Sequence, residues 1–401
     1  MKHIVILGDG MADLPSLELN TLTPLQKAST PNMDRLATMG KSGLFHTVPE
    51  SLHPGSEVAN MAVMGYDVEA LYEGRGVLEA ASIGVTLSPE DLAFRCNLIT
   101  IENGVIKNHS AGHIATEESS ILIDYLNEHL GNDRITFHKG VSYRHLLVIK
   151  GGDKRVSCTP PHDVPDSKED DHLPQAKDSS ASATTKEIID LIKRSQELLS
   201  QHPINKDREK KGKAIASSIW PWSPGNKPEM PTLKEAYKIE NSAVISAVDL
   251  IHGIGIYAGM KVIKVPGATG LWDTNYIGKR DAAIKALETC EYVYLHIEAP
   301  DEAGHEGDPY IKIKAIEDID HHVVGPIVEY ALGQKDVAVA LLPDHPTPWE
   351  LKTHTRDAVP FTIYHPKNNA DSVTEYTESD AAKGAYGEIY KEEFMNLLLN
   401  R

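Results

Sequence analysis

The sequence contains few cysteines, and their positions argue against a disulfide framework or a thiolate metal site. Only Cys96, Cys158 and Cys290 occur in 401 residues, they lie far apart, and none belongs to a CxxC pair. Disulfide-stabilised domains and zinc-thiolate sites use more cysteines at closer spacing. We therefore expect three buried, reduced cysteines and a protein of a reducing compartment.

Long apolar runs are also missing. The first run, HIVIL, reaches Asp9 after a handful of residues, which is too short for the core of a signal peptide or for a membrane span. No later stretch approaches the roughly 18 uninterrupted apolar residues that a transmembrane helix needs. We expect a cytoplasmic protein with no membrane partner.

Positive charge is scarce. The chain has 40 Lys and Arg residues against 58 Asp and Glu residues, which gives a formal net charge of −18. Nucleic acid and anionic membrane surfaces would be repelled by this charge, so neither is an expected partner. A small anionic substrate is compatible only if local cations, either metal ions or arginines, overcome the overall field. Nothing in the sequence indicates an oligomeric state.

The chain does contain enough apolar material for a large core, arranged as alternating strands and helices. Its length favours two domains, and 41% of its residues are hydrophobic. Apolar strand patterns at 3–8, 291–300 and 337–343 alternate with helical patterns such as 280–290 and 311–332. This alternation predicts an α/β fold with a doubly wound, mostly parallel sheet, and no internal repeat is visible.

The pattern changes near residue 90. Residues 95–108 resemble a hairpin around Asn103-Gly104, and a helical run at 118–131 and further strand signals follow. We predict an inserted α+β lid domain at 89–175, with a discontinuous core domain formed by 1–88 and 176–401. The polar, Ser-rich stretch 165–186 is typical of a flexible excursion. The stretch 212–228, GKAIASSIWPWSPGNKP, suggests a strand followed by a rigid aromatic, Pro- and Gly-rich loop.

Four strand signals of the core lead to polar residues that could bind a ligand. Asp344-His345 ends the apolar run 337–342, Asp9 follows strand 3–8, Asp301 follows strand 291–300, and Ser56 follows the loop after the strand signal at 44–49. Ligands of open α/β sheets bind at the carboxyl ends of the strands. Taken alone, Asp344-His345 is more typical of a capped strand end, and Asp9 is equally compatible with a helix N-cap.

Ser56 follows Gly55 at the start of a helical pattern. An N-cap is the commonest role for such a serine, but a nucleophile at a helix N-terminus is the alternative. His305 lies four residues after Asp301, so one helical turn puts both on the same face. The full candidate set contains three Asp, three His and one Ser: Asp9, Ser56, Asp301, His305, Asp344, His345 and His354. Such ligands suit Mn²⁺, Zn²⁺ or Mg²⁺, and their number favours two ions about 4 Å apart, an arrangement associated with phosphoryl transfer.

Cationic and imidazole side chains outside this set are candidates for binding an anion. Arg75 lies between two glycines, where the backbone can approach a ligand closely, and the inserted segment contributes His113, Arg144 and His162. An ordinary surface or core histidine is the alternative for each of the two imidazoles.

Several motifs together resemble those of a known family. They are GDGMAD, HPGSEVAN, GRGVLEAAS, VPGATG, DEAGH, PDHPTP and THTRDAVPF. These motifs, which extend over most of the chain, are similar to those of the cofactor-independent (2,3-bisphosphoglycerate-independent) phosphoglycerate mutases. The resemblance is strongest to the shorter, archaeal-type branch of that family, within the alkaline phosphatase superfamily.

The resemblance implies a two-metal phosphoryl transfer that interconverts 3-phosphoglycerate and 2-phosphoglycerate. One ion would be held by Asp301, His305 and His354, and the other by Asp9, Asp344, His345 and the Ser56 oxygen. Ser56 would take the phosphoryl group, and the glycerate held under the lid would reclaim it on its other hydroxyl. Two divalent ions are implied, Mn²⁺ before Mg²⁺ or Zn²⁺, and 2,3-bisphosphoglycerate is not required. Arg75, His113, Arg144 and His162 are the candidates for binding phosphate or carboxylate.

One motif departs from this pattern. Archaeal-type mutases tend to have an arginine in an AGRI motif, whereas this chain has SAGHI with His113, a weaker anion binder without a guanidinium fork. SAGHIATEE and VSYRHL resemble a bacterial subgroup that has been proposed to act as a homoserine kinase. A homoserine-kinase-like phosphotransferase and a metal-dependent phosphate-ester hydrolase are therefore the alternative hypotheses.

Overall fold

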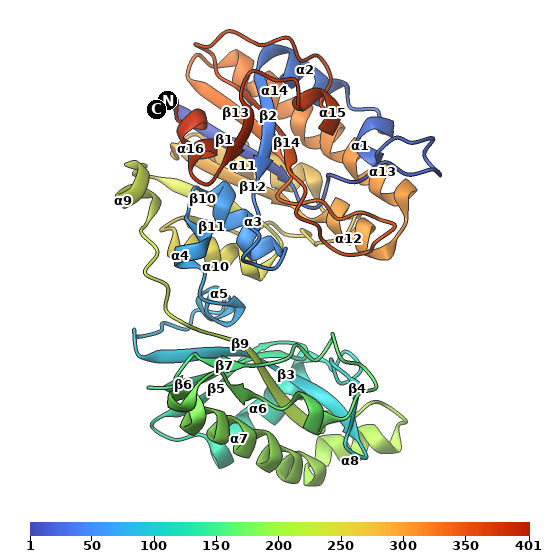
Figure 1. Ribbon diagram of the computed structural model, residues 1–401, viewed down its shortest axis with the longest axis vertical. Coiled ribbons are helices and arrows are strands. Elements are labelled where there is room, and N and C mark those ends of the chain that lie inside the picture. Colours follow the sequence, from blue (N-terminus) through green and yellow to red (C-terminus); the bar gives the residue numbers. More distant parts are fainter. The chain divides into compact units, whose positions relative to one another are not determined.

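The computed structural model describes residues 1–401 and divides into two compact units (Figure 1). The large unit comprises 1–72 and 230–401, and the small unit comprises 73–229. The small unit extends beyond the predicted insertion 89–175 on both sides. It does so because α5 (Arg75–Ser82) packs on β3 (Asp91–Glu102) and β9 (Ser218–Asn226), and β9 pairs with β3.

The large unit contains an eight-stranded sheet in which only one strand runs against the others. The strand order is β11 (Lys261–Ile263), β10 (Ser242–Ile245), β12 (Tyr292–Ile297), β1 (Lys2–Gly8), β13 (Val337–Leu342), β14 (Val359–Tyr364), β2 (Lys41–His46) and β15 (Gly387–Tyr390). Only β14 is antiparallel to its neighbours. The predicted α/β fold with a doubly wound, mostly parallel sheet is confirmed.

Helices lie on both faces of this sheet. Those of the large unit are α1 (Pro24–Lys27), α2 (Pro31–Met39), α3 (Ser56–Val63), α4 (Val68–Leu71), α9 (Leu233–Tyr237), α10 (Asp249–Tyr257), α11 (Tyr276–Ala286), α12 (Ala299–Glu306), α13 (Pro309–Ile319), α14 (Gly325–Gly333), α15 (Glu378–Ala381) and α16 (Glu393–Leu398). The helix predicted at 311–332 is interrupted by a π-helical turn, η3 (Asp320–Val324), between α13 and α14.

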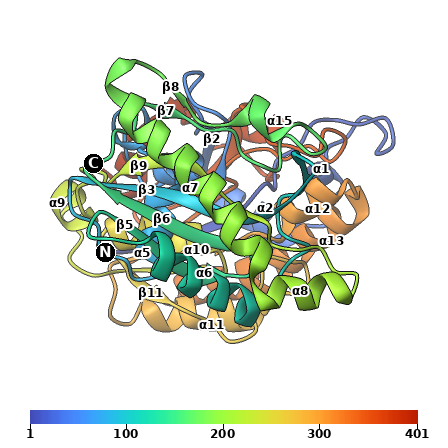
Figure 2. The ribbon, with the colours of Figure 1, turned by 90° about the horizontal axis from the view of Figure 1, so that it is seen from below.

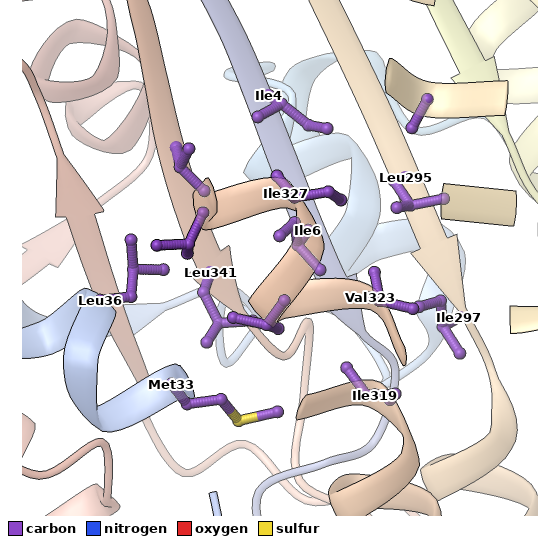
Figure 3. Close-up of a cluster of buried hydrophobic side chains, with 14 of the residues drawn as sticks. Ile4, Ile6, Met33, Leu36, Leu295, Ile297, Ile319, Val323, Ile327 and Leu341 are labelled. Atoms are coloured by element: carbon purple, nitrogen blue, oxygen red, sulfur yellow. The ribbon is translucent and has the colours of Figure 1, made fainter. Parts of the chain in front are cut away.

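Side chains along each strand point alternately to the two faces of the sheet, and this alternation determines which of them reach the core. Leu295 and Ile297 of β12 pack with Ile6 and Leu341 under α2, α13 and α14 (Figure 3). Successive side chains of a strand point to opposite faces, so Tyr294 and His296 point to the face that carries α3. The hydroxyl of Tyr294 accordingly reaches Asn60 on α3.

The small unit is built on an antiparallel sheet. Its other elements are β4 (Val105–Asn108), α6 (Thr116–Leu130), β5 (Ile135–Val141), β6 (Arg144–Lys150), β7 (Val156–Ser157), η1 (Glu169–His172), β8 (Gln175–Ala176), η2 (Ser179–Ala181), α7 (Ser182–Gln201) and α8 (Pro203–Lys210). The order is β4-β3-β6-β5 with β9 also paired to β3. Helices α6 and α7 lie across one face of this sheet (Figure 2).

Two sequence expectations in this unit differ from the structure. The stretch 165–186, expected as a flexible excursion, contains η1, β8, η2 and the first turn of α7. The Pro-rich stretch after Trp220, expected as a loop, continues β9 through Pro221 and Pro224. Because β9 pairs with β3 alone, its missing proline N–H groups disrupt no second ladder.

All three cysteines are free; Cys96 and Cys290 are buried and Cys158 is partly exposed. None of the helices combines the length and the apolar character that crossing a bilayer requires.

Candidate active site

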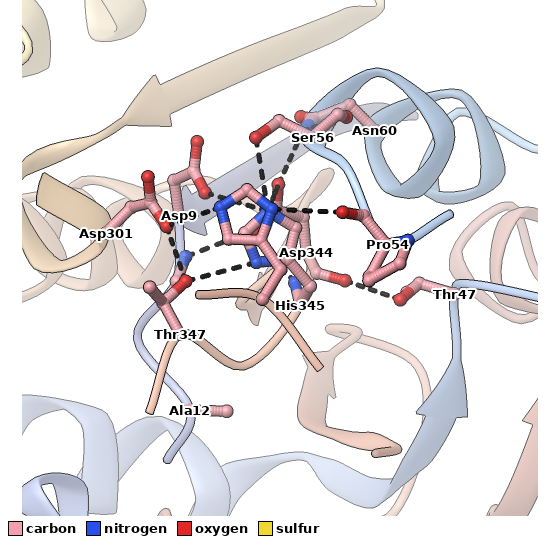
Figure 4. Close-up of polar contacts among 12 residues, drawn as sticks. Asp9, Ala12, Thr47, Pro54, Ser56, Asn60, Asp301, Asp344, His345 and Thr347 are labelled. Carbon is pink, nitrogen blue, oxygen red and sulfur yellow. Dashed lines mark hydrogen bonds and ion pairs between the residues drawn. The ribbon is translucent and has the colours of Figure 1, made fainter. Parts of the chain in front are cut away.

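The candidate site lies at the carboxyl ends of three neighbouring parallel strands, β12, β1 and β13 (Figure 4). Asp301 belongs to the first turn of α12 after β12, Asp9 follows β1, and Asp344 follows β13. All three carboxylates are buried, with exposed fractions of 5%, 1% and 0%. The strand order thus brings together residues that are up to 335 positions apart, at the edge of the sheet where open α/β folds bind ligands.

Asp301, His305 and His354 form one cluster. His305 Nε2 lies 3.3 Å from Asp301 Oδ2, and His354 Nε2 lies 3.3 Å from Asp301 Oδ1. The predicted one-turn spacing on α12 places Asp301 and His305 on the same face. The hydroxyl of Thr347 donates to the same Asp301 carboxylate.

Each of the two imidazoles of this cluster is hydrogen-bonded through its Nδ1 atom to a backbone carbonyl. His305 Nδ1 lies 3.1 Å from the carbonyl of Lys352, and His354 Nδ1 lies 3.2 Å from that of Pro54. A carbonyl only accepts, so each Nδ1 carries the ring hydrogen and each Nε2 is directed inward. The two Nε2 atoms are 2.9 Å apart.

Asp9, Asp344, His345 and Ser56 form an adjoining cluster. His345 Nε2 lies 3.1 Å from Ser56 Oγ, 3.4 Å from Asp344 Oδ2 and 3.6 Å from Asp9 Oδ1. The Asp344 carboxylate accepts hydrogen bonds from the backbone N–H groups of Gly10 and His345. Every residue of the predicted set of seven is therefore in one of these two neighbouring clusters.

Ser56 does not cap its helix. Gly55 is the N-cap of α3, and Ser56 is the first helical residue, with its hydroxyl directed at His345. Its hydroxyl is consequently free of the capping role that the sequence makes most common, and it lies at the positive end of the helix dipole.

Two buried residues of the site were not singled out from the sequence. Asn60 donates from Nδ2 to Asp344 Oδ2 at 2.7 Å and to the carbonyl of Ser56 at 2.8 Å. His296 lies 2.9 Å from Asp9 Oδ2. The sequence features that could have pointed to these two residues are an Asn one helical turn after Ser56 and a His inside an otherwise apolar strand.

The buried carboxylates of the site shift the pKa values of one another and of a neighbouring imidazole. Burial and the nearby carboxylates of Asp344 and Asp301 raise the pKa of Asp9 well above its ordinary value. Burial opposes ionisation of Asp301 as well, but hydrogen bonds with His305 and His354 hold its pKa well below the ordinary range. Its carboxylate in turn raises the pKa of His305 to about 9, against the lowering effect of burial.

These features fit divalent cations. Asp9 Oδ1 is buried without a hydrogen-bond partner, which is costly for a carboxylate oxygen. The facing Nε2 atoms of His305 and His354 need a proton or a cation between them. Ligand atoms of Asp301, His305 and His354, and those of Asp9, Asp301 and His345, lie within 4.8 Å of one another. This donor set of carboxylate oxygens and imidazole nitrogens suits Mn²⁺, Zn²⁺ or Mg²⁺ and does not select among them.

The four predicted anion-binding residues belong to the small unit, where three of them flank an aromatic and imidazole cluster. His113 and Arg144 both lie beside Tyr143. The ring centroid of His113 is 5.9 Å from that of Tyr143, and the guanidinium carbon of Arg144 is 6.0 Å from the Tyr143 ring centroid. The ring of His162 packs edge-to-face against the ring of Trp222, with their centroids 5.2 Å apart. Between these groups lies His109, which contacts the rings of His113, Tyr143 and His162.

Arg75 is placed differently. It starts α5, is half-buried, and its Nε lies 3.1 Å from Glu79 Oε1. The same carboxylate binds Arg95, a buried arginine that the sequence did not single out and whose guanidinium lies 4.9 Å from the ring of Trp222. The Glu79 carboxylate therefore pairs with two guanidinium groups beside the aromatic cluster.

Comparison with known proteins identifies the family. The chain is 49% identical to the 2,3-bisphosphoglycerate-independent phosphoglycerate mutase of Methanosarcina acetivorans, over the full length of both chains. The chain belongs to the 2,3-bisphosphoglycerate-independent phosphoglycerate mutase family. The profile of that family matches residues 37–205. A second relative, from Methanothermobacter thermautotrophicus, is 47% identical over 100% of this chain and 98% of its own.

Similarity to solved structures supports placing this chain in the archaeal-type branch of the phosphoglycerate mutase family. The PH0037 protein from Pyrococcus horikoshii has 30% identity and a TM-score of 0.83, with 100% of this chain and 96% of that chain covered. The cofactor-independent phosphoglycerate mutase from Thermoplasma acidophilum has 26% identity and a TM-score of 0.70, with 100% and 99% covered. The resemblance inferred from the motifs is thereby confirmed at the level of the family.

Proposed function

We propose that this chain interconverts 3-phosphoglycerate and 2-phosphoglycerate by transferring the phosphoryl group through Ser56. The observation that carries the proposal is the placement of Ser56 Oγ 3.1 Å from His345 Nε2, among three buried carboxylates. Full-length relatives that are named phosphoglycerate mutases support the choice of substrate.

In the first transfer, Ser56 Oγ attacks phosphorus and the bond from phosphorus to the glycerate oxygen breaks. This step gives phosphoserine and free glycerate, and the proton lost by Ser56 is balanced by the one that the departing oxygen gains. In the second transfer, the other glycerate hydroxyl attacks the phosphoserine and Ser56 is regenerated. Asn60 holds the Ser56 carbonyl and thereby fixes the start of α3, whose positive end faces the phosphoryl group.

Two divalent cations complete the proposal. Asp301, His305 and His354 would hold one, and Asp9, Asp344, His345 and Ser56 the other. Bound there, they would lower the pKa of the Ser56 hydroxyl and neutralise the phosphoryl oxygens. The protein contributes the fixed orientation of the ligands, through the backbone carbonyls behind His305 and His354 and the amides around Asp344.

The small unit is our candidate for binding the anionic groups of the glycerate moiety. Arg144 and His113 are exposed beside Tyr143, and the same unit contains the guanidinium groups of Arg75 and Arg95, both paired with Glu79. Guanidinium groups recognise carboxylate and phosphate in a bidentate manner, whereas His113 binds an anion strongly only when protonated. We further propose that this unit acts as a lid, the role predicted from the sequence for the inserted domain 89–175.

A substrate panel tests the proposal directly. The metal-free protein would be assayed with and without Mn²⁺ on 3-phosphoglycerate, on 2-phosphoglycerate, and on homoserine with ATP. We expect metal-dependent isomerisation in both directions without added 2,3-bisphosphoglycerate. Ser56→Ala should abolish it while keeping the fold, and Ser51→Ala, a change at an exposed serine of the same segment, is the matched control.

The alternative hypotheses predict different outcomes on the same panel. ATP-dependent phosphorylation of homoserine without isomerisation would establish the kinase-like activity, for which the SAGHI motif with His113 is the motivating observation. Release of inorganic phosphate faster than isomerisation would establish a hydrolase. Isomerisation that survives complete metal removal would overturn the two-ion mechanism.

A further inference from the structure

His296 lies inside β12, fully buried beside the carboxylate of Asp9. Its Nε2 atom is 2.9 Å from Asp9 Oδ2, and its Nδ1 atom is 3.1 Å from Ser246 Oγ. Ligand atoms of Asp9, His296 and Asp344 lie within 4.8 Å of one another, so the imidazole could be either a further metal ligand or a hydrogen-bond donor.

Ser246 distinguishes the two roles. Its Oγ accepts a hydrogen bond from the N–H of Val248 at 2.9 Å, and the other partner of this oxygen is His296 Nδ1. Ser246 is 2% exposed, so a hydroxyl hydrogen without an acceptor would be costly there. The Ser246 hydrogen therefore points at His296 Nδ1, which accepts it. The ring hydrogen of His296 then lies on Nε2, where it faces Asp9 and leaves no lone pair for a metal ion.

The two oxygens of Asp9 consequently differ. Oδ2 accepts from His296, whereas Oδ1 is buried, lacks a hydrogen-bond partner, and lies on the side of His345, 3.6 Å from its Nε2. We propose that His296 is a positioning residue, which donates to Asp9 Oδ2 so that Asp9 presents Oδ1 alone to a divalent ion. This inference rests on the proposed function, because it assumes that Asp9 holds such an ion.

A parallel arrangement on Asp344 supports this assignment. Tyr294 lies two residues before His296 on the same face of β12 and donates from its hydroxyl to Asn60 Oδ1 at 2.6 Å. Asn60 in turn donates to Asp344 Oδ2. Two side chains on one face of β12 thus orient two carboxylates of the site. His296 contacts Asp9 directly, and Tyr294 acts on Asp344 through Asn60.

The experiment measures Mn²⁺ binding to the metal-free, full-length protein at pH 7.5, by the loss of the paramagnetic resonance signal of free Mn²⁺. The variants are His296→Leu, which removes the donor, His296→Gln, which keeps an amide N–H of similar reach, and Ser246→Ala, which removes the partner of Nδ1. We expect wild type to bind two ions. In His296→Leu, one of the two should bind about 10- to 100-fold more weakly. His296→Gln should recover most of that loss, and Ser246→Ala should be intermediate.

His3→Leu is the matched control, because His3 is also a buried histidine in the central sheet and lies at the opposite end of its strand from Asp9. Its Mn²⁺ affinity should equal that of wild type, and thermal unfolding of every variant verifies that it is folded. If His296→Leu does not fold, His296→Gln and Ser246→Ala still make the comparison.

Three results would overturn the positioning role of His296. They are unchanged Mn²⁺ affinity in His296→Leu, equal losses in His296→Leu and His296→Gln, and three ions in wild type with only two in both His296 variants. The last would make His296 a ligand. A wild-type protein that binds no Mn²⁺ would instead contradict the two-ion function itself, whatever the variants do, so the two failures are distinguishable.

Discussion

The Nε2 atom of His305 lies 2.9 Å from the Nε2 atom of His354, and the other nitrogen of each ring is held by a backbone carbonyl. The rings therefore cannot rotate away from each other without losing a hydrogen bond. A divalent ion between them and Asp301 would convert this close approach into coordination.

Metal binding should accordingly stabilise the fold through these two histidines. Mn²⁺ at about 100 times its Kd should add about 2.7 kcal/mol to the free energy of unfolding, seen as a rise in Tm that a chelator reverses. His354→Ala should lose most of this rise. His129→Ala, a change at an exposed histidine of α6, should keep it. An equal rise in all three proteins would show that Mn²⁺ acts elsewhere.

Asn60 should be required for catalysis beyond its contribution to stability. Asn60→Leu removes the donor to Asp344 and to the Ser56 carbonyl, so we expect kcat to fall about 10- to 100-fold. Burial of the unpaired groups should lower the free energy of unfolding by about 1–3 kcal/mol. Steady-state kinetics and urea unfolding measure the two effects separately.

Tyr294→Phe tests the orientation of Asn60. Without the phenol, the amide of Asn60 loses the contact that fixes its Oδ1, so the activity should fall while the free energy of unfolding changes by about 1 kcal/mol. Tyr292→Phe is the control, since the hydroxyl of Tyr292 is buried without a hydrogen-bond partner. Activity equal in the two variants would argue against a role for the contact between Tyr294 and Asn60.

Arg144→Ala should weaken substrate binding and leave the fold intact. Its side chain is exposed, so we expect little change in Tm, but loss of a guanidinium-anion contact should raise KM about tenfold. Arg134→Ala, at another exposed arginine of the small unit, should leave KM unchanged. A normal KM in Arg144→Ala would remove Arg144 from the anion-binding surface.

Stability should fall in mild acid because of His3. Burial lowers the pKa of His3 to about 4, from an ordinary value of 6.5. Between these values the unfolded chain binds a proton that the folded chain does not, so stability is complete above about pH 6.5 and decreases toward pH 4. The shift corresponds to a loss of about 3 kcal/mol. Urea unfolding at pH 5 and pH 7.5 should show a smaller difference for His3→Leu than for wild type, and an unchanged difference would exclude His3 as the cause.

The sequence by itself determined the residue types of the candidate site and their positions relative to strands and helices. Apolar runs ending at Asp9 and Asp344 marked the carboxyl ends of parallel strands, and the four-residue spacing of Asp301 and His305 fixed their common face, because both patterns are local. Motifs spread along most of the chain were sufficient to indicate the family.

Other features were decided only by the tertiary structure. The proline-rich segment β9 forms a strand because it pairs with β3 along one edge only. The small unit extends to 73–229 because this pairing and the packing of α5 attach distant segments to one sheet. Period-2 alternation places His296 and Tyr294 on one face of β12. Only the strand order, with β12 beside β1, brings His296 to Asp9, since strand pairing joins residues 287 positions apart that no local pattern relates.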